Sequence, residues 1–188
     1  MLTDLLASIR IALASIVVCV ILYGGCMLGA ATLLAPQGRL GDIIEIDGRV
    51  VGSRQVAQAF TRPEYIWPRP SAVDYAADAT GGSNLSPANP LIRERAERLL
   101  AELGATAENP APAELVLASG SGLDPHISEA AALFQAERIA RARGVSEQTV
   151  REAISANART IGPGDPVRIV NVLLLNIELD RIAPLPAR

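Results

Sequence analysis

One short segment, Ala118–Ser128, gathers most of the side chains that are equipped for chemistry. It contains Ser119, Ser121, Asp124 and the only histidine, His126. Serine, histidine and aspartate are the residue types of a nucleophilic relay, and an aspartate beside a histidine attracts cations. However, one short loop rarely aims three side chains into a relay, and one histidine with one aspartate falls short of a metal site. We predict a locally capped candidate loop, with partner contact or ion attraction left open, and no catalytic or metal-binding residue.

Nucleotide chemistry is restricted by a missing residue type. All 17 basic residues are arginine, so a P-loop and the Asp-Lys-Thr-Gly-Thr motif of P-type ATPases are both absent. The glycine-rich stretch Ser119–Gly122 can cradle an anion with backbone amides, although a tight turn explains the same glycines. We therefore predict no ATP hydrolysis by this chain and no firmly bound cofactor. Any nucleotide contact would have to be accessory.

Composition also argues against a nucleic-acid partner. The formal net charge is −3 and aromatic residues make up 3% of the chain. Binding to phosphate needs a basic face, and base stacking needs aromatic side chains. We predict no nucleic-acid binding.

A proline-punctuated stretch, residues 61–90, contains candidate interface residues. Tyr65 and Trp67 lie between prolines there, beside Arg69. Aromatic and arginine side chains are enriched at binding hot spots, but they also fill cores, and both interpretations stay open. We count Asn84 with them as a candidate interface residue. A long loop without helix or strand in a domain of this size is usually functional.

The elements that must position these residues begin with a membrane anchor. Residues 11–38 carry no charge, and a helix of that length reaches roughly 40 Å, beyond the roughly 30 Å of a bilayer core. We predict an N-terminal flank (1–10), a transmembrane helix (11–35) and one soluble domain (36–188). A cleaved signal peptide, or a lipoprotein modified at Cys26, is a less favourable interpretation because the apolar run is too long.

The predicted membrane helix has a face suited to another helix. Gly25 and Gly29 form a Gly-x-x-x-Gly pair, which allows close approach of a partner helix, although chance glycine pairs are common. Tyr23 lies near the middle of the span, where its hydroxyl needs a partner. We predict that Gly25, Gly29 and Tyr23 face a partner helix in the lipid.

The soluble part has the pattern of an α+β domain with segregated elements. Asp47-Gly48 between apolar runs predicts a hairpin with a type I′ turn. Helices are predicted from an Asn89 cap to Gly104, from a Ser128 cap to Arg143, and from Ser146 onward. The branched run Arg168–Leu175 predicts a strand, and 176–182 is ambiguous. The fold class is a single N-terminal transmembrane helix followed by one mixed α+β domain.

Four motifs in a fixed order resemble a known family. They are Arg69–Ala72, Gly81–Leu85, Ala118–Ser128 and Val170–Asn176, after one membrane helix. Together they resemble the C subunit of Kdp-type potassium-transporting ATPases over nearly the whole chain. Pro68 stands where that family usually has glycine, and the family's Gly-Ser-Leu-Ile is here Gly-Asp-Ile-Ile from Gly41. These departures put local loop shape in doubt, not the resemblance.

The resemblance implies a complex in a bacterial inner membrane. Its expected partners are a channel-like potassium-binding subunit, a P-type ATPase subunit and a small membrane peptide, besides lipid. The implied role is a non-catalytic accessory subunit. It acts as an assembly factor and catalytic chaperone that assists ATP binding by the ATPase subunit, or as a cap at the ion entrance. The family's soluble domain is assigned to the periplasm, which conflicts with a contact to cytoplasmic ATP.

Two other functions stay open on the residues alone. One is a membrane-anchored domain that binds a small ligand or a cell-envelope partner and has no part in transport. The other is an anchored hydrolase that uses Ser121 or Asp124, which is weakened by the lack of convergent acid, base and nucleophile.

Overall fold

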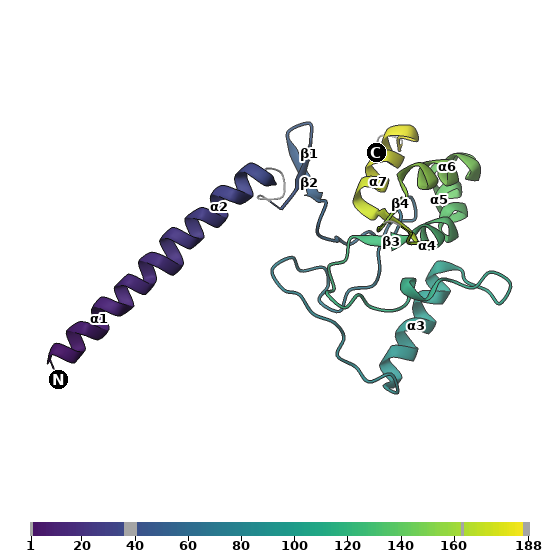
Figure 1. Ribbon diagram of the computed structural model, residues 1–188. Coiled ribbons are helices and arrows are strands. Elements are labelled where there is room, and N and C mark those ends of the chain that lie inside the picture. The colour runs from purple at the N-terminus through teal and green to yellow at the C-terminus, as the bar shows by residue number, and fades with distance from the viewer. Residues whose placement is uncertain (1, 36–40, 163, 186–188) are drawn as a thin grey trace. The chain divides into compact units, whose positions relative to one another are not determined.

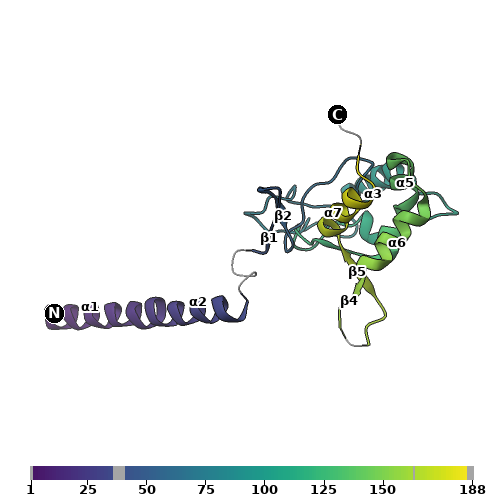
Figure 2. The same ribbon diagram turned by 90° about the horizontal axis from the view of Figure 1, so that it is seen from above.

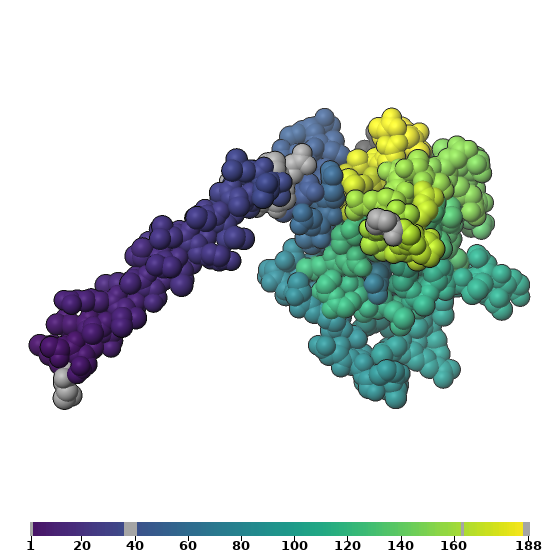
Figure 3. All heavy atoms as spheres, in the orientation of Figure 1, coloured from purple at the N-terminus to yellow at the C-terminus, as the bar shows by residue number. Residues whose placement is uncertain are grey.

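The computed structural model describes residues 2–35, 41–162 and 164–185, and the chain divides into two compact units, residues 1–43 and 44–188 (Figure 1). The first unit is a helical rod made of α1 (Leu2–Ile16), a π-helical segment (Val17–Leu22) and α2 (Tyr23–Leu34). No residue of these segments is buried; the rod is drawn as one straight run of helical turns in Figure 2 and as an elongated rod of atoms in Figure 3. The rod has a mean hydropathy of 2.6 over its most apolar window and is long enough to cross a bilayer.

The first strands of the chain form the predicted hairpin. Strand β1 (Ile43–Ile46) pairs with β2 (Arg49–Ser53) in a two-stranded sheet. Asp47 and Gly48 between them have φ angles of 50° and 73°. Positive φ at both central residues is the requirement of a type I′ turn, so the Asp-Gly prediction is confirmed.

A long coil follows the hairpin and ends at the first helix of the domain. Residues 57–89, all within the described part of the chain, contain no helix or strand, as the prolines predicted. Helix α3 (Pro90–Leu103) then starts as predicted, with the Asn89 side chain accepting from the Leu91 amide at 2.9 Å. It ends at Gly104 with φ 69°.

The predicted helix between Ser128 and Arg143 is two helices. Ser128 caps α4 (Glu129–Phe134), and Gly144 ends α5 (Ala136–Arg143), so the ends are as expected. The break at Gln135 was not predicted. The Gln135 backbone leaves the α4 geometry there (ψ −7°), and its buried side chain bonds to the distant Trp67 backbone. Helix α6 (Glu147–Asn157) follows, with Ser146 as its cap.

A three-stranded antiparallel sheet with the order β3-β5-β4 lies next to these helices. The strands are β3 (His126–Ser128), β4 (Arg159–Thr160) and β5 (Arg168–Asn171). The predicted strand to Leu175 is therefore wrong beyond Asn171, where α7 (Val172–Ile182) begins. Asn171 is a good N-cap and accepts from the Leu174 amide at 3.1 Å. Residues 172, 175 and 179 are buried at helical spacing, which an apolar run alone does not distinguish from a strand.

The core lies between the sheet and the four C-terminal helices. A short 3₁₀ helix (Ala113–Leu115) and the coil at Ile66 also contribute to it. In Figure 1, helices α4 to α7 lie on one side of the long coil of residues 57–89, and α3 lies on the other side. Helix α3 buries none of its residues. The fully buried aliphatic side chains are Ile66, Ile127, Ile139, Ile154, Leu175, Leu179, Val150 and Val170.

Candidate functional site

The four motif segments, distant in sequence, meet in one cluster; two of them are coil, and the other two reach into β3, β5 and α7. The Ser119 amide donates to the Pro70 carbonyl and the Gly81 amide donates to the Ser121 carbonyl, each at 2.9 Å. The Val172 amide donates to the Pro125 carbonyl at the same distance. These backbone bonds replace a regular sheet and hold the candidate loop in place. The fold thus assembles all four motifs that carried the family resemblance.

Two glycines permit this close approach. A Cβ on Gly122, which has φ +70°, would lie 2.6 Å from Val73 Cγ2 and 2.8 Å from the Gly81 carbonyl oxygen. A Cβ on Gly82 would lie 3.1 Å from the Gly120 carbonyl oxygen. Only glycine fits the Gly122 position without a shift of backbone, so close packing explains the glycine at this position, whereas a Cβ on Gly120 would meet nothing within 4 Å.

The serines of the candidate loop bond within the loop. The hydroxyls of Ser119 and Ser121 lie 3.2 Å apart, and Ser121 Oγ accepts from the Leu123 amide at 3.1 Å. Ser119 is buried. Among the described residues neither serine hydroxyl bonds to His126, so the fold assembles no serine–histidine relay there.

Asp124 and His126 belong to a chain of charged and polar groups. Asp124 Oδ1 accepts from the His126 amide at 3.0 Å and lies 3.6 Å from His126 Nδ1. Arg69 Nη1 lies 3.4 Å from Asp124 Oδ2. The hydrogen bond with the His126 side chain, aided by the His126 amide and the Arg69 charge, lowers the pKa of Asp124 against the opposing effect of burial. No group of three or more His, Cys, Asp or Glu side chains in the described ranges is arranged to hold a metal ion.

Tyr65 and Trp67 are packed within the domain. The Tyr65 hydroxyl donates to Asp180 Oδ2 at 3.2 Å, and Trp67 Nε1 donates to the Arg62 carbonyl at 2.9 Å. The guanidinium of Arg138 lies 4.2 Å from the centre of the Trp67 ring. Both aromatic side chains are half-buried, and their role as interface residues stays a prediction. Asn84 is exposed with φ 51°, and its role as an interface residue stays a prediction.

Two buried amides that the sequence analysis missed hold the proline-rich coil. Gln135 Oε1 accepts from the Trp67 amide at 2.9 Å, and Gln135 Nε2 donates to the Trp67 carbonyl at 3.2 Å. Asn176 bonds to Ile66 in the same two-way manner. The available signal was an amide residue inside each apolar helical run, because a buried amide needs partners outside its helix.

The sequence analysis also missed two arginines of α5 that hold the proline-rich coil. The Arg143 side chain is fully buried, yet every donor group has an acceptor. It donates to the carbonyls of Glu64, Leu179 and Ala183 and pairs with Asp180 at 2.8 Å. Arg138 donates to the carbonyls of Pro63 and Tyr65 and to Gln135, and burial lowers its pKa to about 10. Arg138 and Arg143 of α5 therefore fix the proline-rich coil through its backbone carbonyls.

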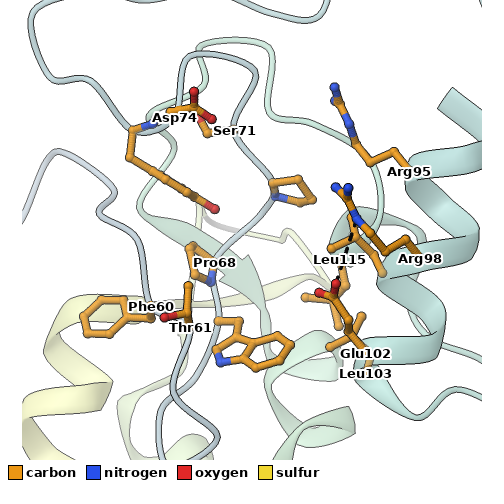
Figure 4. A pocket seen from close by; sticks show the side chains of 14 residues that line it. Phe60, Thr61, Pro68, Ser71, Asp74, Arg95, Arg98, Glu102, Leu103 and Leu115 are labelled. Carbon is orange, nitrogen blue, oxygen red and sulfur yellow. Dashed lines mark hydrogen bonds and ion pairs between the residues drawn. The ribbon is translucent and has the colours of Figure 1, made fainter. Parts of the chain in front are cut away.

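A cavity of about 330 Å³ lies between α3 and the proline-rich coil. Figure 4 shows Arg95 and Arg98 extending from α3 on one side, with Ser71 and Asp74 on the other. Arg98 Nε lies 3.9 Å from Glu102 Oε1, whereas half-buried Arg95 makes no hydrogen bond or ion pair within the described ranges. The apolar lining consists of Phe60, Trp67, Pro68, Pro70, Leu99, Leu103 and Leu115.

The predicted docking face of the membrane helix is open. A Cβ added at Gly25 or Gly29 would meet nothing within 4 Å, and Tyr23 is 64% exposed. Among the described residues of this unit, nothing therefore fills the space beside the two glycines, and most of Tyr23 is exposed. A partner helix at this face stays a prediction.

Comparison with known proteins gives one consistent result. Residues 5–181 match the sequence profile of the KdpC family, described as the c chain of the K⁺-transporting ATPase. A potassium-transporting ATPase KdpC subunit of Parvibaculum lavamentivorans is 50% identical over 181 residues, covering 94% of this chain and 96% of the relative. Proteins of the same name from Sorangium cellulosum (94% and 98% covered) and Myxococcus xanthus (99% and 92%) are each 44% identical.

Proposed function

Because this chain belongs to the KdpC family of K⁺-transporting ATPase subunits, we propose that it is a non-catalytic accessory subunit that joins the transport and ATPase subunits. The observation that carries the proposal is the combination of one bilayer-length apolar rod with a domain whose motif residues hold its own coil together. Such a chain contributes surfaces to a complex rather than reacting groups.

The proposed partners are a channel-like potassium-binding subunit, a P-type ATPase subunit and a small membrane peptide. The open Gly25 and Gly29 face supports helix docking within the bilayer, where small residues allow backbones to approach closely. The soluble domain is proposed to lie on the periplasmic side of the inner membrane, over the ion entrance.

Co-purification tests this proposal directly. The full chain, expressed with the two large subunits and carrying the only affinity tag, should recover both in a fixed stoichiometry. A matched strain that lacks this chain should yield less of the assembled complex. Recovery of the tagged chain alone, together with an unaltered complex in the strain that lacks it, would contradict an accessory role.

Nucleotide assistance is a second candidate role, favoured by the cavity beside α3. Arg95 has no carboxylate partner among the residues that the structure describes, and Trp67 and Tyr75 line the same cavity, so a phosphate and a base have complementary groups there. In the assembled complex, Arg95→Ala should raise the KM for ATP severalfold and leave the potassium dependence unchanged. Arg93→Ala, an exposed position on the same helix that pairs with Glu97, is the matched control.

The cap and the nucleotide contact place the domain on opposite sides of the membrane. Protease added to intact spheroplasts cuts the domain if it caps the ion entrance, and protease added to inverted vesicles cuts it if it assists ATP binding. Cleavage only in inverted vesicles would overturn the periplasmic proposal and leave the accessory role standing.

A further inference from the structure

Helix α3 borders the cavity with a face that the domain leaves only half-buried. Leu99 and Leu103 of this face line the cavity, and α3 as a whole buries none of its residues. With about 330 Å³, the cavity is at the small end of the range of ligand pockets, about 300–1,000 Å³, so it suits one or two side chains. The cavity therefore has room for an apolar group from outside this chain.

One charged residue of the cavity differs from the others in its burial. The charged residues of the lining are Asp74, Arg95, Arg98 and Glu102, and among them only Arg95 is half-buried while the other three are exposed. Arg95 makes no hydrogen bond or ion pair with the residues that the structure describes, whereas Arg98 Nε lies 3.9 Å from Glu102 Oε1. A guanidinium that is partly withdrawn from water without a counter-charge is costly, and its donors match a carboxylate at two points. An acidic group at this wall would therefore be stabilised.

The opposite wall of the cavity holds a strained piece of backbone. Asp74 and Tyr75 have consecutive φ angles of 51° and 57°, and Figure 4 shows Asp74 beside Ser71 across the cavity from α3. Such an angle is an outlier for a side chain as bulky as tyrosine. The Ser71 hydroxyl oxygen accepts from the Val73 and Tyr75 amides at 3.1 and 3.0 Å, and the Tyr75 hydroxyl donates to the Arg69 carbonyl at 2.9 Å. Strain that is held by such bonds is typical of binding sites.

We propose that this cavity is a docking site for a partner subunit, in which an apolar side chain of the partner fills the cavity and an adjacent acidic side chain pairs with Arg95. The inference rests on the proposed accessory role with the domain on the periplasmic side. Trp67, Tyr75 and Arg95 give the lining the residue types that dominate binding hot spots. A nucleotide, which the second candidate role would place here, is the rival occupant of the same cavity.

The charges of the lining favour an acidic partner over a basic one. Water solvates the exposed carboxylates of Asp74 and Glu102, and Glu102 also has Arg98 nearby. A partner cation would therefore gain little from either carboxylate, since exposed pairs contribute little. A partner carboxylate would supply Arg95 with the counter-charge that it lacks within the described part of the chain.

Binding of the full chain to the other subunits tests the docking site. The transport and ATPase subunits, purified together in detergent from a strain that lacks this chain, are titrated with the wild type and its variants. Arg95→Glu should weaken binding by roughly tenfold or more, because it places an anion against the partner's carboxylate. Leu99→Trp should weaken binding as well, because the larger ring occupies the cavity. Arg93→Glu makes the same change of charge at an exposed position of the same helix, where Arg93 pairs with Glu97, and should alter the affinity by less than about twofold.

Photo-cross-linking supplies a measurement that does not depend on a destabilising variant. A p-benzoylphenylalanine in place of Leu99 should cross-link to one of the two large subunits, within a few residues of an aspartate or glutamate. The same group in place of Arg93 should not. Trp67 is the only tryptophan of the chain, so its fluorescence reports directly on the rival occupant. ATP added to the isolated full chain should leave this fluorescence unchanged.

Three results would overturn the docking site. They are equal affinities for Arg95→Glu and Arg93→Glu, a cross-link from position 99 to a segment without acidic residues or to no large subunit, and a saturable fluorescence change with ATP that Arg95→Glu abolishes. Each of them leaves the accessory role standing as long as the wild-type chain binds the other subunits. A wild-type chain that does not bind them would refute the accessory role, and the docking site with it.

Discussion

The side-chain amide of Asn176 makes the two hydrogen bonds with the backbone of Ile66 that a neighbouring β-strand would otherwise make. Asn176 Oδ1 accepts from the Ile66 amide at 2.8 Å, and Asn176 Nδ2 donates to the Ile66 carbonyl at 3.0 Å. Both residues are fully buried. A coil buried without a β partner needs such bonds, because an unpaired buried backbone group costs about as much as a lost hydrogen bond.

Asn176→Ala should therefore destabilise the domain strongly. It leaves the Ile66 amide and carbonyl buried without partners, each at a cost of about 1–3 kcal/mol, so we expect a loss of at least about 2 kcal/mol. Chemical denaturation of the full chain in detergent measures the change. Gln148→Ala is the control, since within the described ranges the exposed Gln148 side chain bonds only to Glu152, and it should change stability by about 0.5 kcal/mol or less. Equal midpoints for the two variants would contradict the role assigned to Asn176.

The two glycines of the candidate loop should respond differently to alanine. Gly122→Ala places a Cβ 2.6 Å from Val73 Cγ2 at φ +70°, so we expect a loss of about 2 kcal/mol or more from clash and backbone strain. At Gly120 a Cβ meets nothing within 4 Å, and Gly120→Ala should be nearly neutral. Thermal unfolding of both variants checks the difference. If both are equally stable, close packing does not explain the motif.

The lowered pKa of Asp124 predicts a loss of stability in acid. The folded state holds this carboxylate charged to a lower pH than the unfolded state does, so its contribution is complete above the unfolded value near 3.9. That contribution disappears as the pH falls through the lower folded pKa. The free energy of unfolding of the wild type and Asp124→Asn, measured from pH 6 to pH 2.5, should therefore converge at the acid end. A gap that stays constant over this range would show that the charge does not matter.

Tyr75 predicts a loss of stability in alkali. Burial raises the pKa of Tyr75 to about 12, and its hydroxyl donates to the Arg69 carbonyl at 2.9 Å. Between pH 10 and 12 the unfolded chain has lost the phenol proton and the folded chain keeps it, so stability falls as the pH rises. Tyr75→Phe should be less stable at neutral pH because it lacks the hydroxyl, and it should show a shallower decline in this window. A decline as steep as that of the wild type would assign the effect to other groups.

Assembly in the membrane should depend on one face of the helix. Gly25→Leu fills the groove that the Gly25 and Gly29 pair leaves open, so we expect a lower yield of the complex in detergent pull-downs. Gly24→Leu is matched in size and lies about 100° away around the helix, and should leave the yield unchanged. Equal yields for both variants would contradict a docking face at Gly25 and Gly29.

Local signals were sufficient for much of the fold. The Asp47-Gly48 turn, the Asn89 cap and the Gly144 stop are each fixed by a few neighbouring residues, and all three occur as predicted. Predictions that rested on apolar runs were weaker. The strand predicted to Leu175 ends at Asn171 because burial, which is decided by distant partners, favours a helix there.

The sequence by itself determined the long charge-free apolar helix, the absence of lysine chemistry and the order of the motifs, because charge-free length and residue type need no partner to be interpreted. Only the tertiary structure decided what the motif residues do. Two contacts join segments that are far apart in the chain, namely Ile66 with Asn176 and Gly81 with Ser121. A local sequence pattern contains no information about such pairs.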